Sequence, residues 1–397
     1  MVKKQTTFTE LTLKGLLLFS IFTVVQGISF FDSINRIWLI FVSIALLGRL
    51  MSYRYSVTEL FVLVVTLALH VIAVCFTEFP LYHTNMLFYF FLWVLLYLFF
   101  AKSREKVLRV LESSKSYISL ILWLWTILVG ISAFLPSCYK ENYFVSFSGN
   151  SFRLMPSALI ITALAMLRDM QSKDRRYCLF LILPTYAAFM NQSRTYFGIY
   201  LLFILMFLYM RTKSRRNFYL LIGPVAAVVV LLALGTGISD KFADVWQESE
   251  TFEAFLASFT NARTVFWKWD LEAFFSLPFW QQFVGNGFNF SYDVTMQHQG
   301  GAIWAHNDII NILMNFGYIG TAIYIWAYFK LSKTYFRNLP GVPRAVKFLF
   351  HGAIFFNSMF NMSYTYFCAV IAYPLFACVI TNKYAPLCAS KNEQNGR

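Results

Sequence analysis

Long apolar stretches alternate with short polar segments along the whole chain. Most of the stretches have roughly 16 to 21 residues, which is about the length that a helix needs to cross a bilayer. Twelve spans are predicted near Leu11–Ser29, Ile37–Leu47, Val57–Phe76, Met86–Ala101, Tyr117–Leu135, Leu154–Leu167, Tyr177–Met190, Thr195–Met210, Asn217–Gly235, Ile309–Phe329, Ala345–Asn361 and Tyr364–Thr381. The sequence therefore predicts an all-α, polytopic membrane protein with about 12 transmembrane helices.

One connection, Thr236 to Ala305, is far longer than the others, and loops of this length in a compact architecture usually carry function. We therefore divide the chain into a transmembrane bundle of about nine spans at 1–235, a long external loop with catalytic elements at 236–305, and a bundle of about three spans at 306–397. Inside the loop, Arg263, Trp267, Asp270 and Phe274 share one face of a predicted amphipathic helix. Its aromatic residues suit a helix at the membrane interface.

The distribution of charge orients these spans. The chain is 58% hydrophobic, only 13% of its residues are charged, and its net charge is +14. With a cytoplasmic N-terminus, 26 of the 33 Lys and Arg fall inside, as the positive-inside rule expects. The sequence thus predicts both termini in the cytoplasm, the long loop outside the cytoplasmic membrane, and contact with anionic lipids of the bilayer but not with nucleic acid. The six cysteines form no C-x-x-C pair, so no metal or other cofactor is expected.

Only seven basic residues lie on the predicted outer side. They are Arg36, Lys140, Arg153, Arg194, Lys241, Arg263 and Lys268. Arg194 lies in a tight link between two spans, where a charge is costly unless it faces a watery cavity or an anionic partner.

His306, in the stretch "AHNDIINILMNFGYIG", stands on the same side immediately before a span. Arg194 and Arg263 can bind phosphate oxygens and stabilise a diphosphate leaving group without a metal. His306 can accept a proton from a hydroxyl nucleophile, and the following helix dipole disfavours its protonated form. The three residues together predict a catalytic site for a phosphorylated, lipid-anchored substrate.

Each residue also has a structural interpretation. Arg194 can snorkel to the headgroups, and Arg263 can be a solvated charge on its helix. His306, Asn307 and Asp308 can form only a helix cap, although Asn307 and Asp308 are also candidates for substrate binding and for orienting the imidazole. Loop aromatics such as Trp267 and Trp304 would either stack on sugar rings or anchor the loop at the interface.

Several of these segments resemble the O-antigen ligase/polymerase superfamily of bacterial integral membrane glycosyltransferases. The resemblance lies in "MNQSRTYFGIYLLF" (190–203), "NARTVFWKWDLEAFF" (261–275), "GNGFNF" (285–290) and "AHNDIINILMNFGYIG" (305–320). It implies metal-independent, inverting glycosyl transfer from an undecaprenyl-diphosphate-linked donor, with Arg194 and Arg263 at the diphosphate and His306 as the base. Many relatives carry another histidine where this chain has Trp304, so the chain either lacks that histidine or uses His298.

The superfamily contains enzymes that differ in their acceptor. We expect a polymerase of O-antigen, capsular or exopolysaccharide, which adds the chain to a lipid-linked repeat unit and can work with a chain-length regulator. A ligase would instead transfer the glycan to lipid A core or another acceptor. A lipid-linked oligosaccharide flippase is an alternative of another class, but transporters place polar features near the bilayer midplane, and here the polar groups gather outside.

Overall fold

The structure, a computed structural model, describes residues 2–83, 86–141, 143–172, 174–191, 193–212, 215–235, 251, 255, 257–258, 260, 262–337, 339 and 341–395. Within these ranges nearly all regular structure is helical, which confirms the prediction of an all-α polytopic membrane protein. Among the positions named above, Lys241 lies outside the described residues.

The helices before the long loop are α1 (Val2–Val24), α2 (Ser29–Met51), α3 (Val57–Phe76), α4 (Met86–Ser113), α5 (Lys115–Ser132), α6 (Ser151–Ser172), α7 (Ile182–Met190), α8 (Arg194–Arg211) and α9 (Arg215–Gly235). Those that follow are α12 (Arg263–Ser276), α13 (Phe279–Val284), α14 (Phe290–Gln299), α15 (Asp308–Phe336), α16 (Arg344–Phe360) and α17 (Phe367–Asn395). Short 3-10 turns are η1 (Pro136–Cys138), η2 (Ser146–Ser148), η3 (Arg175–Leu181) and η4 (Ser363–Thr365). A small hairpin pairs β1 (Tyr139–Lys140) with β2 (Tyr143–Phe144) in antiparallel register.

Eight of the described helices are long and apolar enough to cross a membrane: α2, α3, α4, α5, α6, α8, α15 and the first part of α17. The other four predicted spans coincide with α1, α7, α9 and α16. Of these, α7 has nine residues and α16 has 17, because a polar turn and a proline interrupt the apolar runs nearby.

Burial separates the interior helices from those that face lipid. In α6 and α17, 83% of the residues in the apolar membrane-spanning stretch are buried, whereas in α2 only 11% are. Both kinds of helix are apolar on most sides, because lipid and protein interior favour the same side chains. α17 packs along α6, and α16 packs along α8. The last two helices of the chain therefore pack against helices that precede the long loop.

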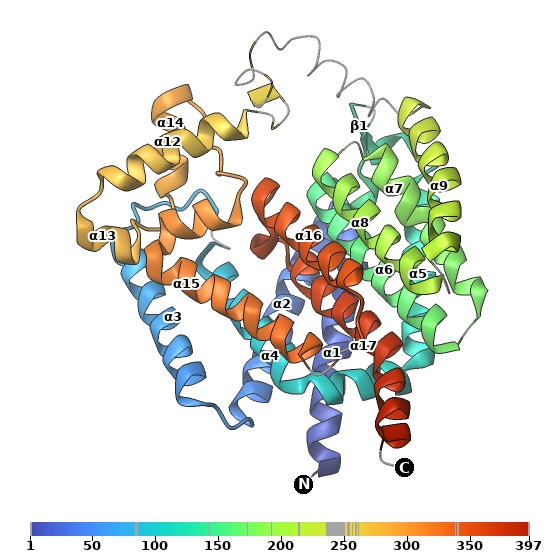
Figure 1. Ribbon diagram of the computed structural model, residues 1–397. Helices are drawn as coiled ribbons and strands as arrows, with labels where there is room; N and C mark the ends of the chain where they lie inside the picture. Colours follow the sequence, from blue (N-terminus) through green and yellow to red (C-terminus); the bar gives the residue numbers. More distant parts are fainter. Residues whose placement is uncertain are drawn as a thin grey trace.

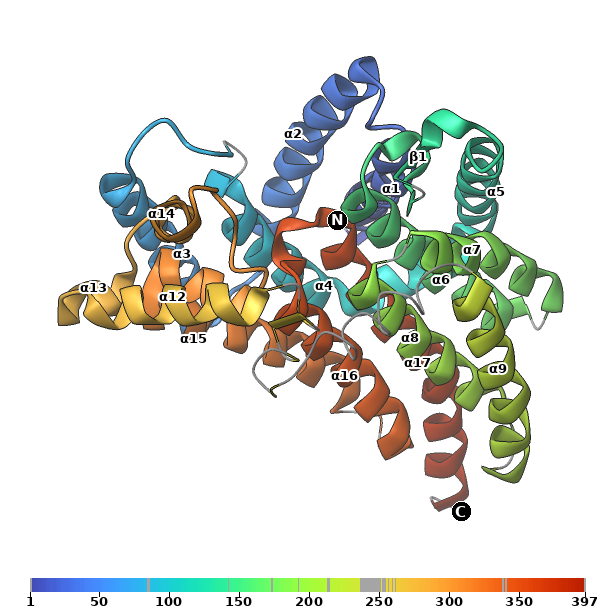
Figure 2. The ribbon, with the colours of Figure 1, turned by 90° about the horizontal axis from the view of Figure 1, so that it is seen from above.

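The helices of the long loop gather at one end of the molecule. Figure 1 shows α12 and α14 at the end opposite to both chain termini, in keeping with an even number of crossings. Seen from above in Figure 2, α12, α13 and α14 lie over α15 and α3, while α5 to α9 form the other side. The predicted helix is present as α12, which buries Asp270 and Phe274 of the predicted face together with Phe266, and exposes Lys268 and Glu272. Arg263 and Trp267 of the predicted face are half-buried.

Two glycines allow α13 to pack closely against α15. Gly285 ends α13 with φ +83°, and a Cβ there would lie 2.3 Å from the backbone carbon of Asn315. Gly317 kinks α15 with φ +63°, and a Cβ there would lie 2.4 Å from the backbone of Phe283. Only glycine permits both the left-handed backbone and the close approach of the two chains. Gly285 of the "GNGF" motif and Gly317 of the "FGYIG" motif therefore allow the end of α13 to pack against the kink of α15.

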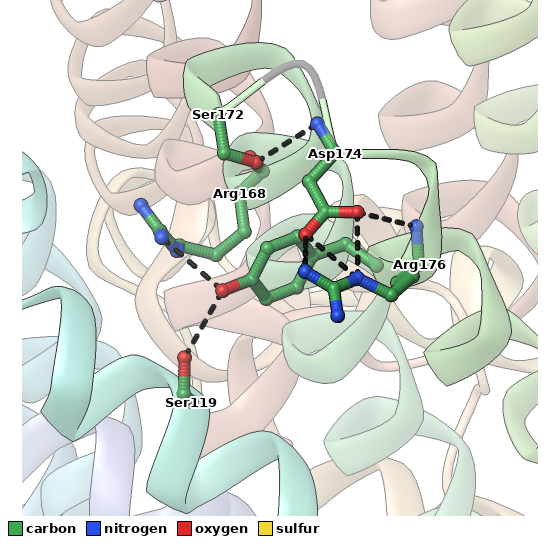
Figure 3. Close-up of polar contacts among 6 residues, drawn as sticks. Ser119, Arg168, Ser172, Asp174 and Arg176 are labelled. Atoms are coloured by element: carbon green, nitrogen blue, oxygen red, sulfur yellow. Dashed lines mark hydrogen bonds and ion pairs between the residues drawn. The ribbon is translucent and has the colours of Figure 1, made fainter.

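At the opposite end, the turn from α6 into η3 is held by polar side chains (Figure 3). Asp174 caps η3 by accepting from the backbone N–H of Arg176, and its carboxylate pairs with the guanidinium of the same arginine at 2.9 Å. Arg168 donates to the hydroxyl of Tyr177 at 3.2 Å. These cations thus serve the local fold.

Candidate active site

The backbone at His306 is set by the cap of α15. Asn307 is the N-cap, and its side-chain oxygen accepts from the backbone N–H of Ile310 at 3.1 Å. The predicted capping role of Asn307 is therefore confirmed. His306 precedes this cap with φ +49°, a left-handed conformation that non-glycine residues rarely adopt. The indole N–H of Trp267 donates to the carbonyl of Ala305 at 2.6 Å and ties this segment to α12.

The two predicted arginines meet where α8, α12 and the end of α16 converge. The guanidinium of Arg263, at the start of α12, donates to the carbonyl of Phe360 and to the hydroxyl of Thr195 at 3.4 Å. Thr195 directly follows Arg194, which opens α8 and donates to the carbonyl of Ser258 at 3.4 Å. Burial and the positive charge of Arg194 lower the pKa of Arg263 to about 10, so both arginines remain charged at neutral pH.

His306 lies beside this pair. Burial, followed by the charge of Arg263, lowers the pKa of His306 to about 4. The imidazole is therefore neutral at physiological pH. Its Nδ1 is buried and has no hydrogen-bond partner among the described residues, and its ring stacks on Phe152 with the centroids 6.2 Å apart. The structure thus brings all three predicted catalytic residues into one neighbourhood.

A cavity of about 810 Å³ opens next to His306. Its lining includes polar and charged side chains, among them Gln26, Asp32, Arg36, His83, Asn150, Arg153 and His306. It also includes apolar side chains, among them Phe19, Leu39, Ile40, Phe88 and Phe367. Arg194 and Arg263 are not among the lining residues; Tyr366, which lines the cavity and interacts electrostatically with Arg263, connects the two parts.

Trp304 also lines this cavity, at the place where relatives often carry histidine. Its ring lies 5.5 Å from the ring of His83 and 5.3 Å from that of Tyr292. A histidine is therefore present beside Trp304, but a distant part of the chain supplies it. His298, the candidate from the sequence, is exposed, stacks on Trp269 at 4.7 Å and does not line the cavity.

Asp308 occupies the protein interior. Its carboxylate accepts from the hydroxyl of Tyr324 at 2.8 Å, from the hydroxyl of Ser363, and from the backbone N–H of Tyr364 at 3.5 Å. The residue is fully buried. Asp308 therefore links α15 to η4. It does not line the cavity, and among the described residues its carboxylate forms no hydrogen bond with His306.

Sequence reasoning did not select His83, Arg36 or Arg153 as site residues. Arg36 and Arg153 were among the few basic residues predicted on the outer side, and that position was the only feature of the sequence that pointed to them as site residues. Arg36 pairs with Asp32 at 2.8 Å, and Gln26 donates to the same carboxylate at 2.8 Å. His83 stands in the short polar segment before α4, which the sequence alone does not place near Trp304.

Comparison with known proteins bears on this site. Residues 179–325 match the sequence model of a family described as O-antigen ligase, and the match includes Arg194, Arg263 and His306. No protein in a search of curated sequences matches the chain. The matched region carries the motifs on which the resemblance was based, and it confirms the resemblance of residues 179–325 to the O-antigen ligase/polymerase superfamily.

Proposed function

We propose that this protein is a polysaccharide polymerase that transfers a glycan chain from an undecaprenyl-diphosphate carrier to a lipid-linked repeat unit. The polysaccharide would be an O-antigen, a capsule or an exopolysaccharide. The observation that carries the proposal is a neutral imidazole, His306, that lies beside the charged Arg263 and lines a cavity with both polar and apolar side chains.

In this reaction a hydroxyl of the acceptor sugar attacks the anomeric carbon of the donor. The carbon–oxygen bond to the carrier diphosphate breaks, and the electron pair leaves with the diphosphate. His306 takes the proton of the attacking hydroxyl, while Arg194 and Arg263 stabilise the negative charge that develops on the leaving group. Direct attack from the opposite face inverts the anomeric centre, and the arginines supply the charge that a metal ion supplies elsewhere.

The cavity suits an amphiphilic substrate. A lipid-linked sugar needs cationic groups for its diphosphate and an apolar surface for its prenyl chain. Arg36 and Arg153 line the cavity together with the apolar side chains of Leu39, Ile40 and Phe88. A polymerase binds two such substrates at once. Arg36 and Arg153 form a second cationic group, apart from Arg194 and Arg263, which fits that requirement.

An outward-facing site is part of the proposal. The charge bias of the loops supports a cytoplasmic location for both termini, and α12 and α14 lie at the opposite end of the molecule (Figure 1). Transfer would therefore occur on the outer leaflet of the cytoplasmic membrane.

Single alanine substitutions test the proposal in cells. We expect Arg194→Ala, Arg263→Ala and His306→Ala each to leave only single repeat units on the acceptor, at normal membrane levels of the protein. Lys268→Ala is the matched control, because Lys268 is an exposed cation on the same helix as Arg263. If surface glycan disappears while long chains persist on the carrier, the protein is a ligase. A normal ladder from all three variants would refute the site.

A further inference from the structure

A second cavity, of about 910 Å³, lies at the far ends of α4 and α15 from His306. Seven of its fifteen lining residues are Lys or Arg. Four come from α4 (Lys102, Arg104, Lys106 and Arg109) and three from α15 (Lys330, Lys333 and Arg337). The only carboxylate among these lining residues is that of Glu105, so the cavity has a large excess of positive charge.

A buried ion-pair network holds the walls of this cavity in place. Glu59 of α3, 1% exposed, pairs with Lys102 of α4 at 2.5 Å and with Lys330 of α15 at 3.1 Å. Ser56 joins Glu59 in a capping box that fixes the start of α3. These ion pairs therefore link α3, α4 and α15 beside the remaining cations of the cavity. Since a single carboxylate pairs with two lysines, the network neutralises only a small part of the positive charge of the lining residues.

The cavity also offers groups for an anionic, amphiphilic ligand. The Nε of Arg104 is buried without a hydrogen-bond partner among the described residues. Phe329, 63% exposed, and Trp326 line the cavity from α15 beside the cations. An apolar surface next to clustered cations at the end of membrane helices suits a lipid, because acyl chains and a phosphate headgroup can be bound together.

We propose that this cavity binds the headgroup of a multiply anionic phospholipid in the leaflet opposite the candidate active site. A headgroup with two phosphates, such as that of cardiolipin, matches the number of cations better than a single phosphate does. Bound lipid would join α3, α4 and α15 at the end remote from His306. The proposal does not depend on the proposed enzymatic function.

Native mass spectrometry of the delipidated full-length protein tests this site. Cardiolipin would be titrated against phosphatidylethanolamine, which has no net charge, and against inorganic pyrophosphate. We expect cardiolipin to bind selectively, and the double variant Arg109→Gln/Lys333→Gln to bind it roughly 10- to 30-fold more weakly. Glu105→Gln, which removes the one lining carboxylate, should bind it more tightly.

A matched control removes the same charge elsewhere at this end of the molecule. Lys115→Gln/Arg175→Gln changes two exposed cations outside the cavity, and should bind cardiolipin like the unmodified protein. The charge-preserving Arg109→Lys/Lys333→Arg should also retain binding, which separates lost charge from misfolding. Equal weakening in the control would overturn the proposal. Displacement of the lipid by equimolar pyrophosphate would identify a site for soluble phosphate instead and would equally refute a lipid site.

Discussion

His306 combines a left-handed backbone with a neutral, buried imidazole. In a non-glycine residue this conformation costs about 1 kcal/mol, and such strain is concentrated at functional sites. The sequence predicted the cap at Asn307 because side-chain capping is local. It also predicted a disfavoured imidazolium, but from the helix dipole, whereas burial and the charge of Arg263 from a distant segment lower the pKa. It did not predict the left-handed backbone of His306.

The charge of the substrate should alter the basicity of His306. In the empty site burial and Arg263 hold its pKa near 4, so the base remains unprotonated down to that pH. A bound diphosphate would offset the arginine charge and raise the pKa of His306 toward neutrality. We therefore expect the acid limb of kcat/KM well below pH 6.5, and the acid limb of kcat at a higher pH. Initial rates across the pH range measure both limbs. A kcat/KM limb at 6.5 or above would contradict this electrostatic account.

At the scale of helices, two glycines allow α13 to pack closely on α15. The G-x-G and G-x-x-G motifs are visible in the sequence, but the contact between their segments is not, because they are far apart along the chain. The backbone N–H of Asn286 donates to the carbonyl of Met314 at 2.9 Å across this contact. The end of α13 is thus held against the kink of α15, the helix that His306 precedes.

Substitution of Gly317 should disrupt this packing. A Cβ there would overlap the backbone of Phe283, whereas a Cβ at Gly300, also at positive φ, meets no atom within 4 Å. We expect Gly317→Ala to reduce the free energy of unfolding by about 1–3 kcal/mol more than Gly300→Ala does. Thermal unfolding of both variants in detergent measures the difference. Equal losses would show that backbone strain alone, and not the contact, matters.

A buried carboxyl links α12 to α14. Asp270 accepts from the hydroxyl of Ser291 at 2.9 Å, and burial raises its pKa to about 7. The folded state therefore retains a proton that the unfolded state loses above about pH 3.9, so stability falls as pH rises from 4 to 7. We expect Asp270→Asn, which keeps an acceptor for Ser291, to unfold at a higher temperature than the unmodified protein at pH 8, with little difference at pH 4. Glu272→Gln, on the exposed side of α12, should show no such dependence. An Asp270→Asn variant less stable at pH 8 would contradict the raised pKa.

For the whole molecule, the sequence predicted the membrane class, which the structure confirms, and it selected three candidate residues that the structure brings together. It could not predict the cavity, since hydrophobic patterns do not reveal which spans are neighbours. Arg36, His83 and Arg153 come from α2, the segment before α4, and α6, and they line one space only because these helices pack together. All three lie outside the region that matches the O-antigen ligase family.

The most direct test is reaction of the purified protein with a lipid-diphosphate-linked repeat unit as both donor and acceptor, in the presence of a metal chelator. We predict chains of increasing length on the lipid carrier, release of carrier diphosphate and inverted anomeric linkages. His306→Asn, which tolerates the left-handed backbone, should fold normally and lose roughly 100-fold or more in rate. Repeat units that remain single with the unmodified protein, but are transferred to an added acceptor that is not carrier-linked, would contradict polymerisation.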